Sequence, residues 1–201
     1  MNYSVILEKE LENMINDSKE YTLLLHSCCA PCSSYVISYL IKYFNITVLY
    51  YNPNISPKEE YEKRKKEQIR LITEMEHNKK LNFIDCDYDN EIFENMIKGL
   101  EKEKEGGSRC LKCYKLRLEK TAIIAKNNNF DYFCSTLTVS PHKNSKILNE
   151  IGLALEKEHN IKWLCSDFKK KEGFKKSIEL SKKYNLYRQD YCGCIYSKIN
   201  K

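Results

Sequence analysis

Apolar residues are distributed along the chain in short runs that alternate with longer amphipathic stretches. Five runs rich in leucine, β-branched or aromatic residues predict buried strands at 22–26, 46–51, 82–85, 132–135 and 161–165. After the first run, apolar residues recur at helical spacing at Val36, Ile37, Leu40, Ile41 and Phe44. The same spacing recurs at Ile92, Phe93, Met96, Ile97 and Leu100. Strands that alternate with helices indicate an α/β fold, a single Rossmann-like domain in which helices flank a mostly parallel sheet.

The chain contains no internal repeat, low-complexity segment or obvious linker, and its 201 residues are enough for one hydrophobic core. We therefore expect a single α/β domain over residues 1–201. Within it we expect an N-terminal helix over 1–20 and an α/β core over 21–184. A C-terminal segment, residues 185–201, carries the sequence Cys192-Gly193-Cys194.

The composition of the chain gives no sign of a membrane-spanning segment or a secretion signal. No stretch approaches the roughly 18 apolar residues that a membrane span requires, and the charged N-terminus lacks the apolar region of a signal peptide. We expect a cytoplasmic protein with no membrane partner. The net charge is +6, and basic runs occur at 63–66, 169–171 and 175–176. These runs indicate either a solvated surface or contact with a polyanion such as RNA, and charge alone does not separate the two.

Ten cysteines are present, and seven of them fall into three tight groups. In a reducing compartment, structural disulfides are not expected. Tight cysteine groups that a fold brings together are typical of metal and redox sites. The groups are Cys28, Cys29 and Cys32, then Cys110 and Cys113, and finally Cys192 and Cys194.

The first group lies between the first predicted strand and the helix that follows it. In parallel sheets, ligands bind beyond the carboxyl ends of the strands. The sequence Cys29-Ala30-Pro31-Cys32 is similar to that of thioredoxin, and a helix N-terminus favours thiolates. These features favour thiol–disulfide exchange. The third thiol, Cys28, favours metal ligation instead, and a structural zinc site is a further alternative.

The second group follows two glycines that predict a turn, and we expect Ser108 to cap the next helix. Because positions i and i+3 share a helix face, the sulfurs of Cys110 and Cys113 can point at one metal centre. Together with Cys28 and Cys29 they provide four thiolates. Four thiolates complete either a [4Fe–4S] or a zinc site.

The third group, Cys192-Gly193-Cys194, can form a disulfide only through a tight bend, which Gly193 permits. The small ring would be strained and easily reduced, which favours a redox role. The alternative is a second pair of metal ligands.

The remaining cysteines, Cys86, Cys134 and Cys165, each end an apolar run, and we interpret them as small core residues. His26 lies in the first strand and is interpreted as a core residue. His142 follows the fourth strand and is a candidate for handling a proton or an anion.

Four segments together resemble one known family, the QueH type of epoxyqueuosine reductase. The segments are 26–32, 51–55, 109–114 and 191–194, and the resemblance spans roughly residues 21–197. It implies reduction of epoxyqueuosine to queuosine at the wobble position of tRNA, with electrons from a donor that the sequence does not identify. It also implies a [4Fe–4S] cluster on Cys28, Cys29, Cys110 and Cys113.

The resemblance further implies that Cys192 and Cys194 form a redox-active disulfide. An additional iron is associated with the family, and Cys32 lies where it could help bind one. The substrate base lies in an anticodon loop, and aromatic side chains stack on such bases while basic ones contact phosphates. Candidate substrate contacts are Tyr51, Asn52, Arg109, Tyr114, His142 and Tyr191.

Removing an epoxide oxygen as water requires two electrons and two protons. We expect Cys192 and Cys194 to shuttle the electron pair, while the cluster or an adjacent iron acts as a Lewis acid. Two other functions remain open at this point. One is a thioredoxin-like oxidoreductase that uses Cys29 and Cys32, and the other is a zinc-stabilised RNA-binding module.

Overall fold

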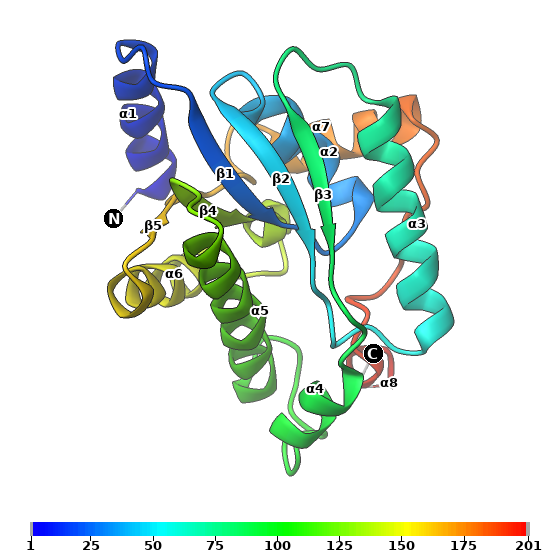
Figure 1. Ribbon diagram of the computed structural model, residues 1–201. Coiled ribbons are helices and arrows are strands. Elements are labelled where there is room, and N and C mark those ends of the chain that lie inside the picture. The colour runs from blue at the N-terminus through cyan, green and yellow to red at the C-terminus, as the bar shows by residue number, and fades with distance from the viewer. Residues whose placement is uncertain (1, 200–201) are drawn as a thin grey trace.

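Five parallel strands form the centre of the protein (Figure 1). The computed structural model describes residues 2–199. The sheet order is β3-β2-β1-β4-β5, and every neighbouring pair is parallel. The predicted α/β fold with a parallel sheet is confirmed. The strands are β1 (Tyr21–His26), β2 (Phe44–Tyr50), β3 (Leu81–Asp85), β4 (Tyr132–Ser135) and β5 (Lys162–Trp163).

Helices cover both faces of the sheet (Figure 1). One face carries α2 (Ala30–Leu40), α3 (Lys58–Glu74) and α7 (Gly173–Lys183), and the other carries α5 (Ser108–Asn127) and α6 (Ser145–His159). The remaining elements are α1 (Tyr3–Ile15), α4 (Asn90–Met96), the 3-10 helix η1 (Thr136–Val139) and α8 (Ile195–Ile199). Within the described part of the chain, no helix is both long and apolar enough to cross a bilayer.

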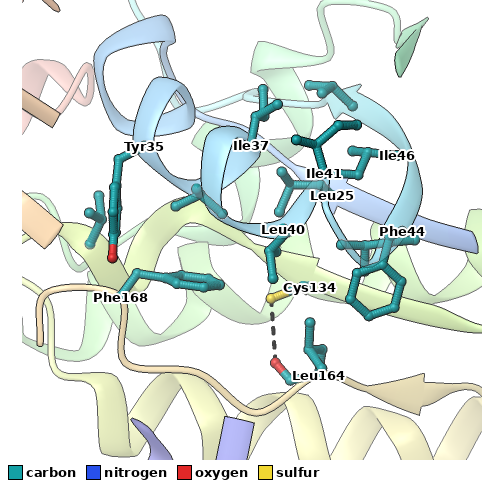
Figure 2. Packing of buried hydrophobic residues seen from close by; sticks show 14 of the residues in the cluster. Leu25, Tyr35, Ile37, Leu40, Ile41, Phe44, Ile46, Cys134, Leu164 and Phe168 are labelled. Atoms are coloured by element: carbon teal, nitrogen blue, oxygen red, sulfur yellow. Dashed lines mark hydrogen bonds between the residues drawn. The ribbon is translucent and has the colours of Figure 1, made fainter. Parts of the chain in front are cut away.

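The three central strands, β2, β1 and β4, are largely buried on both sides, which explains their apolar runs, whereas the edge strands β3 and β5 are partly exposed. In β1, Leu23 and Leu25 face the core beneath α2, while Leu24 faces the core beneath α5. Figure 2 shows the first of these cores, where Leu25 and Leu40 lie near Cys134. Cys134 donates a hydrogen bond to the Leu164 carbonyl at 3.4 Å, so this thiol is a core residue as predicted. Full burial of a leucine side chain such as Leu25 contributes roughly 1.5–3 kcal/mol to the free energy of folding.

The strand order also determines where a ligand can bind. The chain runs from β1 outward through β2 to β3, and then returns to build β4 and β5 on the opposite side of β1. The connections that leave β1 and β4 therefore diverge to opposite faces, and a crevice opens between them at the carboxyl edge. Residues 27–29 follow β1 at this crevice, and η1 follows β4 there.

Two predicted helical patterns extend further than the helices themselves. Phe44 continues the apolar spacing of α2, but it is the first residue of β2 and pairs with Tyr21. Helix α4 ends at Met96, and Leu100 lies in a turn after it. The first pattern identifies buried positions, but in the second Ile92 is 49% exposed and Leu100 is only half-buried. In both places the chain reversal that ends the helix leaves no apolar signal.

Two further details differ from expectation. The residue that caps α5 is Gly107, whose extended backbone precedes the helix, and Ser108 is the first helical residue and makes no capping bond. Strand β5 covers 162–163 rather than 161–165, because the chain leaves the sheet after a last bond from the Leu164 amide to the Phe133 carbonyl.

Candidate active site

Cys28, Cys29 and Cys32 lie at the crevice, between the carboxyl end of β1 and the first turn of α2. Their sulfur atoms all lie within 4.8 Å of one another. Cys29 has an extended backbone and precedes α2 as its cap residue, and Pro31 stands in the first turn. A proline there suits a helix start, because its missing N–H would have had no helical partner. The three thiols form a compact group of soft ligands.

The three thiols differ in their affinity for protons. Hydrogen bonds with Cys29 and Cys32 lower the pKa of Cys28 well below its usual 9.0, and the positive charges of Lys143 and Arg117 act in the same direction. The bond to Cys28 raises the pKa of Cys29 to about 12, and the pKa of Cys32 is raised in the same way. The lowered pKa of Cys28 favours its thiolate over those of Cys29 and Cys32, as expected of a nucleophile or a metal ligand.

A cleft of about 340 Å³ connects this group with the C-terminal segment. Cys28 and Cys32 line it on one side, and Tyr191 and Cys192 line it on another. His142 also lines the cleft and is exposed, so it and Tyr191 are the predicted substrate contacts that a bound molecule could reach.

A second, smaller hollow adjoins the cleft. It is lined by Cys110 and Cys113 of α5 together with Cys192 and Cys194, so Cys192 borders both spaces. Burial raises the pKa of Cys113 to about 12. Cys113 and Cys194 pack with Phe93 and Ile97 near α4, and Figure 1 shows α8 beside α4. The second and third cysteine groups thus lie side by side.

Three buried cations lie among the cysteines: Arg109, which the sequence singled out, and Arg117 and Lys143, which sequence reasoning missed. Arg117 is 1% exposed and borders both the cleft and the smaller hollow. Its Nε donates to the Cys113 carbonyl at 3.3 Å, and its Nη2 has no hydrogen-bond partner among residues 2–199. Burial alone would lower the pKa of Lys143, but the neighbouring Cys192, Tyr114 and Cys28 raise it above its usual value. Arg117 follows Cys113 by one helical turn, and this spacing could have indicated from the sequence that Arg117 lies beside the cysteine.

The other predicted substrate contacts are buried and have structural partners. The Tyr51 carbonyl lies 3.1 Å from Nε2 of His26, a residue that is fully buried as expected. Asn52 donates to the Ser27 carbonyl at 2.8 Å. Nη1 of Arg109 donates to the carbonyls at positions 100, 101 and 103, which holds the turn before α5. Tyr114 packs in the core beneath α5.

These residues suit a thiolate-bound metal group. Among the described residues, the three cysteines whose sulfurs lie close together are Cys28, Cys29 and Cys32. Cys110 and Cys113 are not in this group and line the adjoining hollow instead. All three cysteine groups nevertheless border two connected spaces. Arg117 and Lys143 supply positive charge that would offset bound thiolates, and the unpartnered Nη2 of Arg117 is free to meet an anionic group.

Comparisons with known proteins identify the family of the chain. The family model described as epoxyqueuosine reductase QueH matches residues 23–200. The chain is 40% identical to "Epoxyqueuosine reductase QueH" of Streptococcus pyogenes serotype M1, over 98% of this chain and 78% of the relative. It is also 40% identical to the protein of that name from Staphylococcus epidermidis (100% and 86%), and 31% identical to that from Thermotoga maritima (90% and 92%). This chain therefore belongs to the epoxyqueuosine reductase QueH family.

Proposed function

We propose that this protein reduces epoxyqueuosine to queuosine at the wobble position of tRNA. Membership of the QueH family supports the reaction. The observation that carries the proposal to this chain's own residues is the meeting of three cysteine groups at one edge of the sheet, around a cleft that opens to the surface.

Four cysteines would hold a [4Fe–4S] cluster, namely Cys28, Cys29, Cys110 and Cys113. Their support is the chemistry of the donor set, two thiols on each of two adjoining elements with buried cations between them. Cys32, whose sulfur belongs to the tight group, would help to bind an additional iron. When bound, such a centre transfers single electrons and polarises an epoxide oxygen as a Lewis acid.

Cys192 and Cys194 would supply the electron pair. Oxidation of two thiols to one disulfide releases two electrons and two protons, the amounts that convert an epoxide oxygen to water and leave a carbon–carbon double bond. An external electron donor then returns two electrons, and two protons from solvent restore the dithiol. Cys192 borders the cleft where the substrate would lie, while Cys194 is 7% exposed and lies behind it.

The anticodon arm would dock along α7, which supplies Phe174 and Ser177 to the cleft wall. Next to these residues, Lys175 and Lys176 are exposed, and only Lys175 has an acidic partner, Glu172, in the described chain. Phosphate contacts of this kind give affinity without reading sequence.

In the basic run 63–66, two of the four cations have acidic partners. Arg64 is buried against Glu60, and Lys65 is paired with Glu62 and Asp85. Lys63 lies over the ring of Tyr187, with its Nζ 3.5 Å from the ring centroid. Lys63 and Lys66 are nevertheless exposed, so what supports α7 as the RNA-binding rim is that its residues Phe174 and Ser177 line the cleft.

The decisive experiment starts from anaerobically purified protein. We expect iron and sulfide with iron–sulfur absorbance, and we expect queuosine to appear in tRNA that carries epoxyqueuosine when a reductant is added. Cys192→Ser should keep the absorbance and lose turnover. Cys165→Ser is the matched control, because Cys165 is a half-buried cysteine that lines neither hollow.

Each alternative gives a different result. Bound zinc without turnover would support an RNA-binding module, and metal-free protein with disulfide-exchange activity would support a thioredoxin-like enzyme. Loss of absorbance in Cys192→Ser would make Cys192 a cluster ligand and contradict its role as an electron carrier.

A further inference from the structure

Arg64 lies in a basic run of α3, yet its side chain is only 2% exposed. Its Nε donates to Oε1 of Glu60, one turn earlier on the helix, at 2.6 Å. A guanidinium is costly to bury unless its donors are used. The remaining donors of Arg64 should therefore reveal why it is buried.

Those donors reach the segment that carries the third cysteine group. Nη1 donates to the Cys192 carbonyl at 3.3 Å, and Nη2 donates to the Tyr191 carbonyl at 3.4 Å. The guanidinium carbon also lies 5.0 Å from the centroid of the Tyr191 ring. One side chain on α3 thus holds two successive carbonyls that are more than 120 positions away in sequence.

The segment is seated closely at this point. Gly193 has φ of +107°, and its carbonyl accepts from the Ser56 amide at 2.9 Å. A Cβ at Gly193 would lie 3.0 Å from Nη1 of Arg64 and 2.8 Å from Cγ1 of Ile55. Arg64 and the loop before α3 therefore determine both the position and the bend of Cys192-Gly193-Cys194.

The same face of α3 also holds the first cysteine group. Gln68, one turn after Arg64, is fully buried, and its Oε1 accepts from the hydroxyls of Ser27 and Ser33, each at 2.6 Å. These serines flank Cys28 and Cys32 in the sequence. Arg64 and Gln68 thus lie one turn apart on α3, with Arg64 bonded to the segment of the third cysteine group and Gln68 to the serines beside the first.

We propose that Arg64 is a positioning residue for the redox pair. By holding the Tyr191 and Cys192 carbonyls, it presents Cys192 to the cleft and keeps Cys194 inside, at a set place relative to the first cysteine group. Arginine suits this task because its planar fork donates in several directions at once, whereas lysine offers one compact charge. The catalytic consequence rests on the proposed function, but the positioning itself does not.

The test compares Arg64→Met and Arg64→Lys with the wild-type holoenzyme. After anaerobic reduction, a brief iodoacetamide pulse and mass spectrometry give the ratio of alkylation rates at Cys192 and Cys194. In the wild type, Cys192 should react faster because it borders the cleft. In Arg64→Met we expect that ratio to fall about fivefold, because local detachment of the segment exposes Cys194. Arg64→Lys should lie between the two.

Turnover provides a second readout. Because Arg64 is itself buried and meets the cleft only through Tyr191 and Cys192, kcat should fall about tenfold in Arg64→Met, a larger change than that in KM for tRNA. Arg70→Met is the matched control. Arg70 is also on α3 and donates to the carbonyls of Tyr184 and Asn185, but it touches no part of 191–194. Its alkylation ratio and kcat should equal those of the wild type.

An unchanged alkylation ratio in Arg64→Met, with or without a lower unfolding temperature, would overturn the proposal and leave Arg64 a purely structural residue. If Arg64→Met does not fold, Arg64→Lys decides by the same ratio. Absence of reductase activity in the wild type would refute the proposed function, while the alkylation ratio would still test the positioning.

Discussion

Asn149 of α6 offers a quantitative test of how α6 is joined to β5 and to the segment that follows it. The side chain is fully buried and uses its whole hydrogen-bonding capacity. Its Nδ2 donates to the carbonyls of Ser145 at 2.7 Å and Ser166 at 2.8 Å, and its Oδ1 accepts from Nε1 of Trp163 and the amide of Ser166, each at 3.0 Å. One amide group therefore joins α6 to the chain after β5.

Asn149→Leu keeps roughly the same volume and removes all four bonds. The Ser145 carbonyl can retain its helical partner, so three buried groups lose theirs. These groups are Nε1 of Trp163 and the amide and carbonyl of Ser166. Each unsatisfied buried group costs about 1–3 kcal/mol. We expect the free energy of unfolding to fall by about 3–9 kcal/mol, a large share of the 5–15 kcal/mol that is typical of a domain.

Urea unfolding measures this change directly. Trp163 is the only tryptophan in the sequence, so its fluorescence reports on this contact while circular dichroism follows the helices. For a domain with a slope near 2–3 kcal/mol per molar urea, the midpoint should drop by at least about 1 M with an unchanged slope.

Asn128→Leu is the control. Its amide donates to the Ile124 carbonyl on the exposed end of α5, and the change should alter the free energy of unfolding by less than about 0.5 kcal/mol. A loss below about 1 kcal/mol in Asn149→Leu would refute the reasoning, because it would mean that the three buried groups find other partners.

Three further predictions concern the site and its surroundings. Gly193→Ala should lower reductase kcat by about tenfold, because the new methyl group would displace the segment from Ile55 and Arg64 and misplace the dithiol. Replacing Lys175 and Lys176 with glutamine should weaken tRNA binding in a filter assay and reduce the slope of log affinity against log salt by about 1–2. An ion pair with Arg70 lowers the pKa of Glu67 below its usual 4.5. The stability that this ion pair contributes is present above pH 4.5 and is lost as the pH falls through the lowered pKa. Glu67→Gln should therefore flatten the acid limb of a plot of unfolding free energy against pH.

Controls separate these effects from general damage. Lys42 and Lys80 lie just before β2 and β3, at the opposite edge of the sheet, so their double glutamine variant removes the same charge and should leave tRNA affinity nearly unchanged. Equal weakening by both pairs would contradict docking along α7. An acid limb that is identical in Glu67→Gln and the wild type would show that Glu67 does not contribute to acid unfolding.

Much of the fold follows from local patterns. The apolar runs located all five strands within a few residues, because strands that are buried on both faces need an uninterrupted run such as 22–26. The position of Cys28 and Cys29 after the first strand also predicted which edge of the sheet would carry chemistry. Helix ends were located less well, as at Phe44, because their capping depends on backbone geometry that apolar spacing does not report.

The site residues show where local patterns stop being informative. Tyr51, Asn52, Arg109 and Tyr114 stood beside recognisable motifs, but they are buried and hold backbone or core. Proximity in sequence to a motif does not determine whether a side chain faces solvent or core.

The sequence by itself thus determined the α/β class, the cysteine groups and their resemblance to one family, since each depends on spacing between near neighbours. Only the tertiary structure decided that Cys192 shares a cleft with Cys28. It also decided that Arg64, from a run that looked like solvated surface, lies buried against the carbonyls of Tyr191 and Cys192. Arg117 and Lys143 became part of the site in the same way. The physical reason is that these contacts join residues far apart along the chain, and their energy arises from burial and hydrogen bonding that exist only once the elements have packed.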